Sequence, residues 1–148
     1  MLGFGPHLVF DGYRCPASRL NDLGSLYRLL DGLPAEIGMT RIMPPYVFRH
    51  GAGNRGEGLS GFVLIAESHI SVHTFPKRGF VNVDIFSCLN FEVEDALAAL
   101  REAFTPHRID WKLLDRGREF PKQIGPSRSV VARERHRIAI AHGLEASR

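Results

Sequence analysis

"GFVLIAESHISVHTF", residues 61–75, is the stretch that decides the fold. An apolar run leads into Glu67 and Ser68, and alternation of apolar and polar residues then resumes with Ile70 and Val72. Apolar residues at every second position are typical of a strand with one buried face. The stretch therefore predicts two antiparallel strands that meet at a tight turn around the Glu-Ser pair.

Strand-type and helix-type patterns alternate along the rest of the chain. Further extended segments are predicted at 7–15, 39–50, 79–88 and 107–117, and a glycine-rich loop is predicted at 51–61. The prolines of the second of these segments place it at a sheet edge, because proline cannot donate a hydrogen bond to a central ladder. Consecutive strands with short links form antiparallel pairs.

Two amphipathic helices are predicted to pack on this sheet. Leucines at helical spacing cover 17–33, where Ser18 is a candidate N-cap and Gly32 a candidate C-terminal glycine. The second helix covers 92–104. Two helices on one face of a mainly antiparallel sheet make an α+β two-layer sandwich. The other face of the sheet is then either solvated or a partner surface.

The chain has the size and composition of one soluble globular domain. Its 148 residues are 44% hydrophobic and 24% charged, and the longest apolar run, five residues, is too short to cross a bilayer. The N-terminal stretch has neither a basic start nor a small-residue cleavage site, which indicates a cytoplasmic chain with no membrane partner. Cys15 and Cys88 are therefore predicted to be thiols rather than a disulfide.

The basic charge of the chain is confined to its C-terminal tail. Residues 127–148 hold five arginines and two glutamates, a sum of +3 that equals the formal net charge of the whole chain. Residues 1–126 are therefore neutral overall, and they are predicted to form the domain. A basic tail without a basic body does not favour a nucleic-acid partner. The apolar spacing within the tail is compatible with a helix.

Two motifs are rejected on their structural context. "GAGNRG" at 51–56 has the G-x-G-x-x-G spacing of dinucleotide sites, but a strand follows it instead of the helix that would bind a pyrophosphate. His69 and His73 have the spacing of helical zinc ligands, but on a strand they lie about 13 Å apart, too far to share one metal. We therefore expect neither a dinucleotide nor a metal.

Ser68 is a candidate nucleophile of an unusual kind. A hydroxyl in a strained turn can attack the carbonyl of its own preceding peptide bond, and elimination from the resulting ester converts the serine into a pyruvoyl group. This chemistry requires a base and a proton donor nearby. Ends of antiparallel neighbours come together, so Ser68, His73 and Cys88 are expected to converge.

Several separated motifs resemble those of one family. "GLSGFVLIAESHISVHTFP" followed by "VDIFSC", with "GPHLVFDGYRC" at the start, closely resembles the bacterial and archaeal S-adenosylmethionine decarboxylase proenzymes. The resemblance covers roughly residues 3–118. It implies self-cleavage between Glu67 and Ser68, which gives a β chain of residues 1–67 and an α chain that begins with a pyruvoyl group made from Ser68.

The resemblance also implies roles for three further residues. Ser60 and His73 stand where the family has its processing residues, and Cys88 stands where it has the catalytic proton donor. The substrate amine would form a Schiff base with the pyruvoyl ketone, which takes the electrons released with carbon dioxide as pyridoxal phosphate does elsewhere. Neither pyridoxal phosphate nor a metal is then needed, and the active form would be a homodimer of cleaved protomers.

The sequence departs from the family pattern at the substrate site. The family usually reads "HTWPE", whereas this chain reads "HTFPK", so that Phe75 replaces tryptophan and Lys77 replaces glutamate. That glutamate is the family's expected partner for the two ribose hydroxyls, and an ammonium cannot accept their protons. The glycine loop at 51–59 and the basic tail are further departures.

Three hypotheses remain open. The first is a decarboxylase of S-adenosylmethionine for polyamine and spermidine biosynthesis, with Phe75 and Lys77 at an adjusted substrate site. The second is a pyruvoyl decarboxylase that has shifted to a small-molecule amino acid such as ornithine or arginine, whose second cation would need Asp11, Glu57 or Asp84. The third is a non-catalytic homologue, against which the intact set of processing residues argues. The first is favoured.

Overall fold

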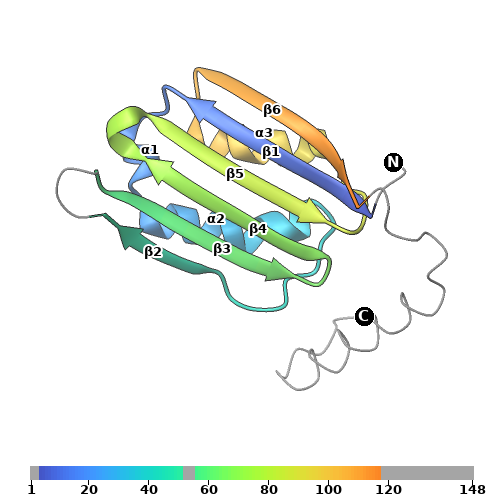
Figure 1. The fold of residues 1–148 in the computed structure, drawn as a ribbon. Coiled ribbons are helices and arrows are strands. Elements are labelled where there is room, and N and C mark those ends of the chain that lie inside the picture. Colours follow the sequence, from blue (N-terminus) through green and yellow to red (C-terminus); the bar gives the residue numbers. More distant parts are fainter. Residues whose placement is uncertain (1–3, 52–55, 118–148) are drawn as a thin grey trace.

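The computed structural model describes residues 4–51 and 56–117, which form one antiparallel sheet with helices on one side (Figure 1). The strands are β1 (Gly5–Tyr13), β2 (Tyr46–His50), β3 (Gly58–Ile65), β4 (Ser68–Phe75), β5 (Phe80–Ser87) and β6 (Arg108–Arg116). The helices are α1 (Ala17–Leu20), α2 (Leu23–Glu36) and α3 (Val93–Phe104), with a 3₁₀ helix η2 (Pro76–Arg78). None of the helices in these two ranges is long and apolar enough to cross a membrane.

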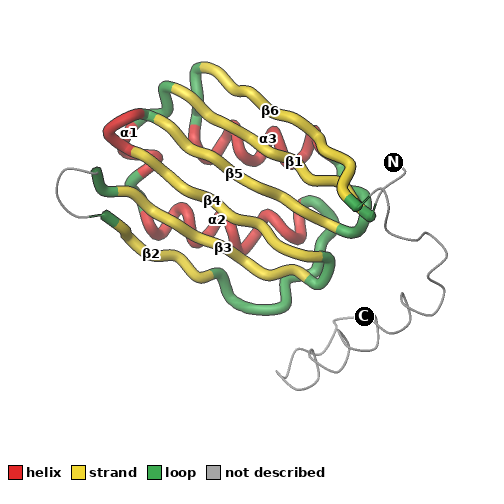
Figure 2. The backbone as a smooth tube through the Cα atoms, viewed as in Figure 1, coloured by secondary structure: helices red, strands yellow, loops and turns green. Residues whose placement is uncertain are grey.

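The six strands are ordered β2-β3-β4-β5-β1-β6, and all neighbouring pairs are antiparallel. Helices α2 and α3 contact each other and cover one face, while the opposite face carries no helix among the described residues (Figure 2). The predicted α+β sandwich is therefore confirmed, with β2 at one edge as its prolines indicated. The one-turn helix α1 was not predicted.

The core lies between the sheet and the two long helices. Alternate residues of the central strands, such as Ile70, Val72 and Val83, are at most 1% exposed and face α2 and α3. Leu30 of α2 approaches β3 so closely that a Cβ on Gly61 would lie 2.7 Å from its Cδ1 atom. The absence of a side chain at Gly61 allows α2 to pack closely on β3. This close packing determines which residues of the strands face away from the helices.

The first helical segment is broken where one helix over 17–33 was predicted, and this prediction is wrong in its bounds. Asp22, not Ser18, caps the long helix, because its carboxylate accepts a hydrogen bond from the Ser25 amide at 2.9 Å. The hydroxyl of buried Thr74 donates to the Leu20 carbonyl at 2.8 Å, at the end of α1. The hydrogen bond at this break therefore connects the helical layer to β4.

The strand boundaries also differ in detail from those predicted. The turn between β3 and β4 is formed by Ala66 and Glu67, so only Glu67 of the Glu-Ser pair lies in the turn, and Ser68 is the first residue of β4. The expected loop at 51–61 is shorter, because β3 begins at Gly58. The tail at 127–148, including its expected helix, lies outside the described residues.

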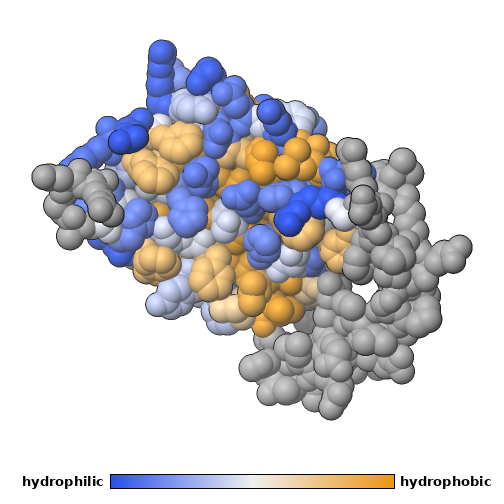
Figure 3. Space-filling view, in the orientation of Figure 1, coloured by the Kyte–Doolittle hydropathy of each residue, from blue (hydrophilic) through white to orange (hydrophobic). Residues whose placement is uncertain are grey.

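The face without helices carries a mixed surface of polar and apolar side chains (Figure 3). Its apolar members near β2 and β3 are Tyr46, Phe48, Phe62 and Leu64, each between 37% and 58% exposed. Tyr46 packs against both Phe48 and Phe62. We name this side of the sheet the open face.

Replacing Gly32 with alanine tests the corrected helix. Gly32 lies within α2, and the nearest atom to an added Cβ is the Glu36 Oε1 at 3.5 Å, so Gly32→Ala should raise the free energy of unfolding by about 0.5–1 kcal/mol in urea denaturation. Gly38, with φ of +73°, is the matched control, and Gly38→Ala should lower it. A loss of stability in Gly32→Ala would contradict the helix bounds.

Candidate active site

The Glu67–Ser68 peptide bond lies at the end of the sheet where β3, β4 and β5 meet. Ser68 pairs with Ile65 of β3 on one side and with Ser87 of β5 on the other. The amide of Cys88 donates a hydrogen bond to the Glu67 carbonyl oxygen at 3.0 Å. The carbonyl that the Ser68 hydroxyl would attack is therefore already held by a fixed donor, the arrangement that stabilises a developing oxyanion.

The side chain of Glu67 is anchored away from Ser68. It is 7% exposed, and its carboxylate accepts a hydrogen bond from the Thr40 amide at 3.1 Å. The Thr40 carbonyl in turn accepts from the Ala66 amide at 2.8 Å. The segment that precedes β2 thus fixes the two turn residues that directly precede the scissile bond.

Cys88 is positioned by close packing of β1 against the end of β5. A Cβ on Gly5 would lie 1.9 Å from the Ser87 carbonyl oxygen and 2.7 Å from the Cys88 Cα atom. Only glycine fits at this contact. The expected approach of Ser68 and Cys88 is therefore a consequence of the register, since Cys88 directly follows the residue that pairs with Ser68.

The two cysteines differ in burial. Neither Cys15 nor Cys88 forms a disulfide, as predicted. Cys15 is 5% exposed, and burial raises the pKa of its thiol above the usual range. A buried thiol of raised pKa is inert, so Cys15 is a core residue, whereas Cys88 is partly exposed.

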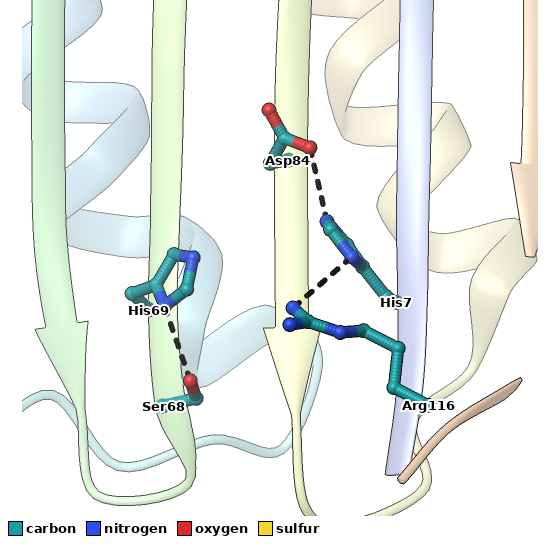
Figure 4. Close-up of polar contacts among 5 residues, drawn as sticks. All are labelled: His7, Ser68, His69, Asp84 and Arg116. Carbon is teal, nitrogen blue, oxygen red and sulfur yellow. Dashed lines mark hydrogen bonds and ion pairs between the residues drawn. The ribbon is translucent and has the colours of Figure 1, made fainter. Parts of the chain in front are cut away.

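The hydroxyl of Ser68 contacts His69 directly (Figure 4). The Ser68 Oγ atom lies 3.1 Å from the His69 Nδ1 atom. The ring of His69 packs edge-on against Phe86, with 5.9 Å between centroids. Burial lowers the pKa of His69 below its usual range, and the positive charges of His7 and Arg116 act in the same direction, while Asp84 opposes them.

Three charged or titratable groups surround this histidine on the open face. The His7 Nε2 atom lies 2.9 Å from the Asp84 carboxylate. The guanidinium of Arg116 lies 4.2 Å from the centre of the Phe86 ring and 3.5 Å from the His7 Nδ1 atom. None of these contacts was predicted, because they join strands that are far apart in sequence.

Ser60 and His73 form a second group further along the same strands. They are a direct cross-strand pair, with 2.7 Å between the Ser60 Oγ and His73 Nδ1 atoms. His73 lies five residues from Ser68 on β4, which is about 16 Å along a strand. Within one chain, His73 therefore does not approach Ser68 as expected. Cys88 does lie at the Ser68 end of the sheet.

Phe75 and Lys77 lie at the far end of β4 from Ser68. Phe75 stacks on Phe80 with 5.6 Å between centroids and meets His50 edge-on at 6.5 Å. The strand ends at Phe75, so strand alternation does not reach Lys77, which is exposed in η2. Lys77 therefore does not share a strand face with His73.

The three acidic residues proposed for a second cation are dispersed. Asp84 lies on the open face beside His7, Asp11 pairs in register with Asn82 and Asp110, and Glu57 is exposed just before β3. Of these, only Asp84 is near the Ser68 end. Asn82 also pairs with His73, and its buried Oδ1 atom has no hydrogen-bond partner within the part of the chain that the structure describes. The Ser60–His73 pair therefore has an unused acceptor beside it.

A surface pocket of about 300 Å³ lies on the helical side of the molecule. Its lining includes Arg19, Leu26 and Phe104, from the three helices. It is in the layer opposite the open face, where His69 and His73 lie. It therefore has no part in the arrangement around Ser68.

A profile of the family described as S-adenosylmethionine decarboxylase matches residues 6–117. The chain belongs to the S-adenosylmethionine decarboxylase family. It is 33% identical over 118 residues to the S-adenosylmethionine decarboxylase proenzyme of Acidithiobacillus ferrooxidans, a match that covers 79% of this chain and 85% of the relative. It is 32% identical over 117 residues to the proenzyme of Thermoplasma acidophilum, with 78% and 86% covered.

The fold of the S-adenosylmethionine decarboxylase family is also found in the structural comparison. The crystal structure of adenosylmethionine decarboxylase from Aquifex aeolicus superposes with a TM-score of 0.67 at 28% identity, covering 78% of this chain and 92% of that one. The proenzyme of Archaeoglobus fulgidus is 49% identical over 61 residues, 40% of this chain and 54% of the relative. The predicted family is confirmed.

Removing the Glu67 carboxylate should loosen the turn. Glu67→Ala leaves the Thr40 amide without its acceptor, which should cost about 1–3 kcal/mol in the free energy of unfolding. Glu67→Gln keeps an acceptor oxygen and should cost less than about 1 kcal/mol. Equal stabilities of the two variants in urea denaturation would show that the Thr40 contact contributes nothing.

Proposed function

We propose that the protein is a self-processing decarboxylase that cleaves itself between Glu67 and Ser68, and that Ser68 becomes a pyruvoyl group. The observation that carries this proposal is the Glu67 carbonyl, held at 3.0 Å by the Cys88 amide, next to the Ser68 hydroxyl. The products are a β chain of residues 1–67 and an α chain from residue 68. The names of the relatives, which are proenzymes, support it.

The residues around Ser68 fit such a group. When formed, the pyruvoyl group supplies an electron sink for the bond that is lost with carbon dioxide. Cys88 follows β5 at the same sheet end, where its thiol can return a proton to the substrate carbon. The role of Gly5 is to hold Cys88 there by close approach. The domain is assigned to residues 1–126 and the tail to 127–148.

The active form is proposed to be a homodimer in which each site is shared. Ser60 and His73, assigned to processing, lie about 16 Å from Ser68 along β4, so a second chain is the source of this pair at each cleavage site. Exposed apolar side chains on the open face, among them Phe48, Phe62 and Leu64, support pairing of two such faces. The end of β4 that carries Phe75, together with Lys77 in η2, would then lie near Ser68 of the other chain.

S-adenosylmethionine is the proposed substrate, in the cytoplasm, in the branch of metabolism that supplies aminopropyl groups for polyamines such as spermidine. The names of the relatives support this choice. The single observation that favours the alternative, a decarboxylase of ornithine or arginine, is Lys77 in place of an expected ribose-binding glutamate. The exposed ammonium of Lys77 is free to turn away from a ribose, so the first substrate is kept.

Self-cleavage is directly measurable by mass spectrometry of the purified protein. We expect two chains split between Glu67 and Ser68, the second lacking a free amino terminus. Ser68→Ala should remain a single chain, because the attacking hydroxyl is absent. A wild-type protein that decarboxylates as one intact chain would refute the proposal.

Cleavage across the dimer can be tested by co-expression of two variants. Neither Ser68→Ala nor His73→Ala should cleave alone. Together, a mixed dimer has one site with an intact Ser68 from one chain and an intact His73 from the other, so the His73→Ala chain should be cleaved. If His73 acts only within its own chain, that chain will stay whole in the mixture.

Exchange of the charge at position 77 distinguishes the two substrates. With S-adenosylmethionine as substrate, Lys77→Glu should leave kcat/KM unchanged or raise it up to about tenfold, the effect of about 1.4 kcal/mol of regained hydrogen bonding. Arg78→Glu makes the same charge change at the next residue of η2 and is the control. Wild-type turnover of ornithine or arginine without turnover of S-adenosylmethionine would favour the alternative.

A further inference from the structure

Among residues 4–51 and 56–117, the nitrogen base within hydrogen-bond distance of the Ser68 hydroxyl belongs to the next residue, His69. The Ser68 Oγ to His69 Nδ1 distance is 3.1 Å (Figure 4). Neighbouring residues of a strand ordinarily project to opposite faces. At the first residue of β4 the two side chains nevertheless meet. This contact needs an explanation beyond packing, because the same hydroxyl is the proposed nucleophile.

We propose that His69 is the catalytic base of self-processing, which accepts the Ser68 hydroxyl proton at Nδ1 while Oγ attacks the Glu67 carbonyl carbon. The inference rests on the proposed cleavage at Ser68. In this step the Oγ–C bond forms and the carbonyl electron pair moves onto the Glu67 oxygen, where the Cys88 amide donates to it. The C–N bond then breaks, and the nitrogen of Ser68 takes the proton back from the imidazolium. The product is an ester with a free amine, and no other reactant is consumed.

The competing bases are less well placed. The Glu67 carboxylate is buried and engaged by the Thr40 amide. His73 is held by Ser60 at 2.7 Å and lies four residues further along the open face than His69, about 13 Å away. His73 is thereby left for a later or a shared role, and among the described histidines it is His69 that touches the reacting oxygen.

The surroundings of His69 keep it in the form that can accept a proton. Burial lowers the pKa of its ring, and the positive charges of His7 on β1 and Arg116 on β6 lower it further, while Asp84 on β5 opposes them. The residues opposite it in register are Leu64 on β3 and Phe86 on β5, and both are uncharged. A neutral imidazole near pH 7 is the state that general-base catalysis needs.

The inference is tested by the rate of cleavage of newly synthesised chain, followed by mass spectrometry after cell-free translation. His69→Asn places an amide oxygen near the position of Nδ1, so it can still orient the hydroxyl but cannot accept its proton. We expect cleavage to slow at least about 100-fold, the lower end of general-base effects. His107→Asn, at an exposed histidine after α3, is the matched control and should cleave at the wild-type rate.

The pH dependence gives a readout that a structural role would not change. The cleavage rate should fall as the pH drops through the pKa of His69, because the protonated ring cannot act as a base. Arg116→Gln removes a charge that lowers this pKa and should move the fall to higher pH. Asp84→Asn removes a charge that raises it and should move the fall to lower pH. Added imidazole should partly restore cleavage of His69→Ala.

The outcomes separate this inference from the proposed function. A wild-type chain that never cleaves would refute both. Cleavage in wild type and in His69→Asn at rates within a few-fold of each other would refute only the role of His69. Should His69→Asn not fold, as judged by circular dichroism, the opposed shifts of the Arg116→Gln and Asp84→Asn profiles decide, and two shifts of the same sign would overturn the inference.

Discussion

The register of β3, β4 and β5 is the constraint on which the rest of the structure depends. The turn at Ala66 and Glu67 sets it, by pairing Ser68 with Ile65, and the neighbouring strand then places Ser87 beside Ser68. A slip of one residue would move every side chain of β4 to the other face. Ile70 and Val72 would then lie on the open face, and the Ser60–His73 pair would be lost. Burial of one face therefore maintains the chemistry of the other.

The helical layer contributes to the site through the same register. Close approach of α2 to Gly61 and the bond from Thr74 to Leu20 hold the helices on β3 and β4. The segment after α2 carries Thr40, whose amide and carbonyl fix the turn at Glu67 and Ala66. The self-cleavage proposed at Ser68 thus takes place on rigid elements, the condition under which a reactive geometry is maintained.

Much of the fold could be predicted from the sequence because alternation of buried and exposed residues is a local property. The strands, their antiparallel order around the turn, the long helices and the open face follow from that property. The helix break at Asn21 and Asp22 was missed, because the leucine spacing continues through it and the deciding contact, from Thr74, is 54 residues away in sequence. The 3₁₀ turn at Lys77 was missed because Pro76 ends the alternation.

The candidate site was predictable only as a set of residue types. Ser68 and Cys88 lie at paired strand ends, where Cys88 follows the residue that pairs with Ser68, and sequence order suggests this arrangement. His7 and Arg116 reach His69 through three strands, and no local pattern marks that arrangement. The separation of His73 from Ser68 could have been read from their spacing, because five residues of strand span about 16 Å. Convergence was inferred instead from the general rule that the ends of antiparallel neighbours come together.

The spacing along β4 explains why this strand carries two histidines. His69 and His73 are four residues apart, so both side chains face the open side. The first stands at the bond to be broken, and the second pairs with Ser60 near the middle of the sheet. The nucleophile at the end of β4 and the separate hydroxyl–imidazole pair about 13–16 Å away cannot be brought together by side-chain motion within one chain. Two copies related by a twofold axis across the open face can bring the Ser68 end of one sheet next to the Ser60–His73 pair of the other. Because His69 and His73 are separated by an even number of residues, both histidines face that interface.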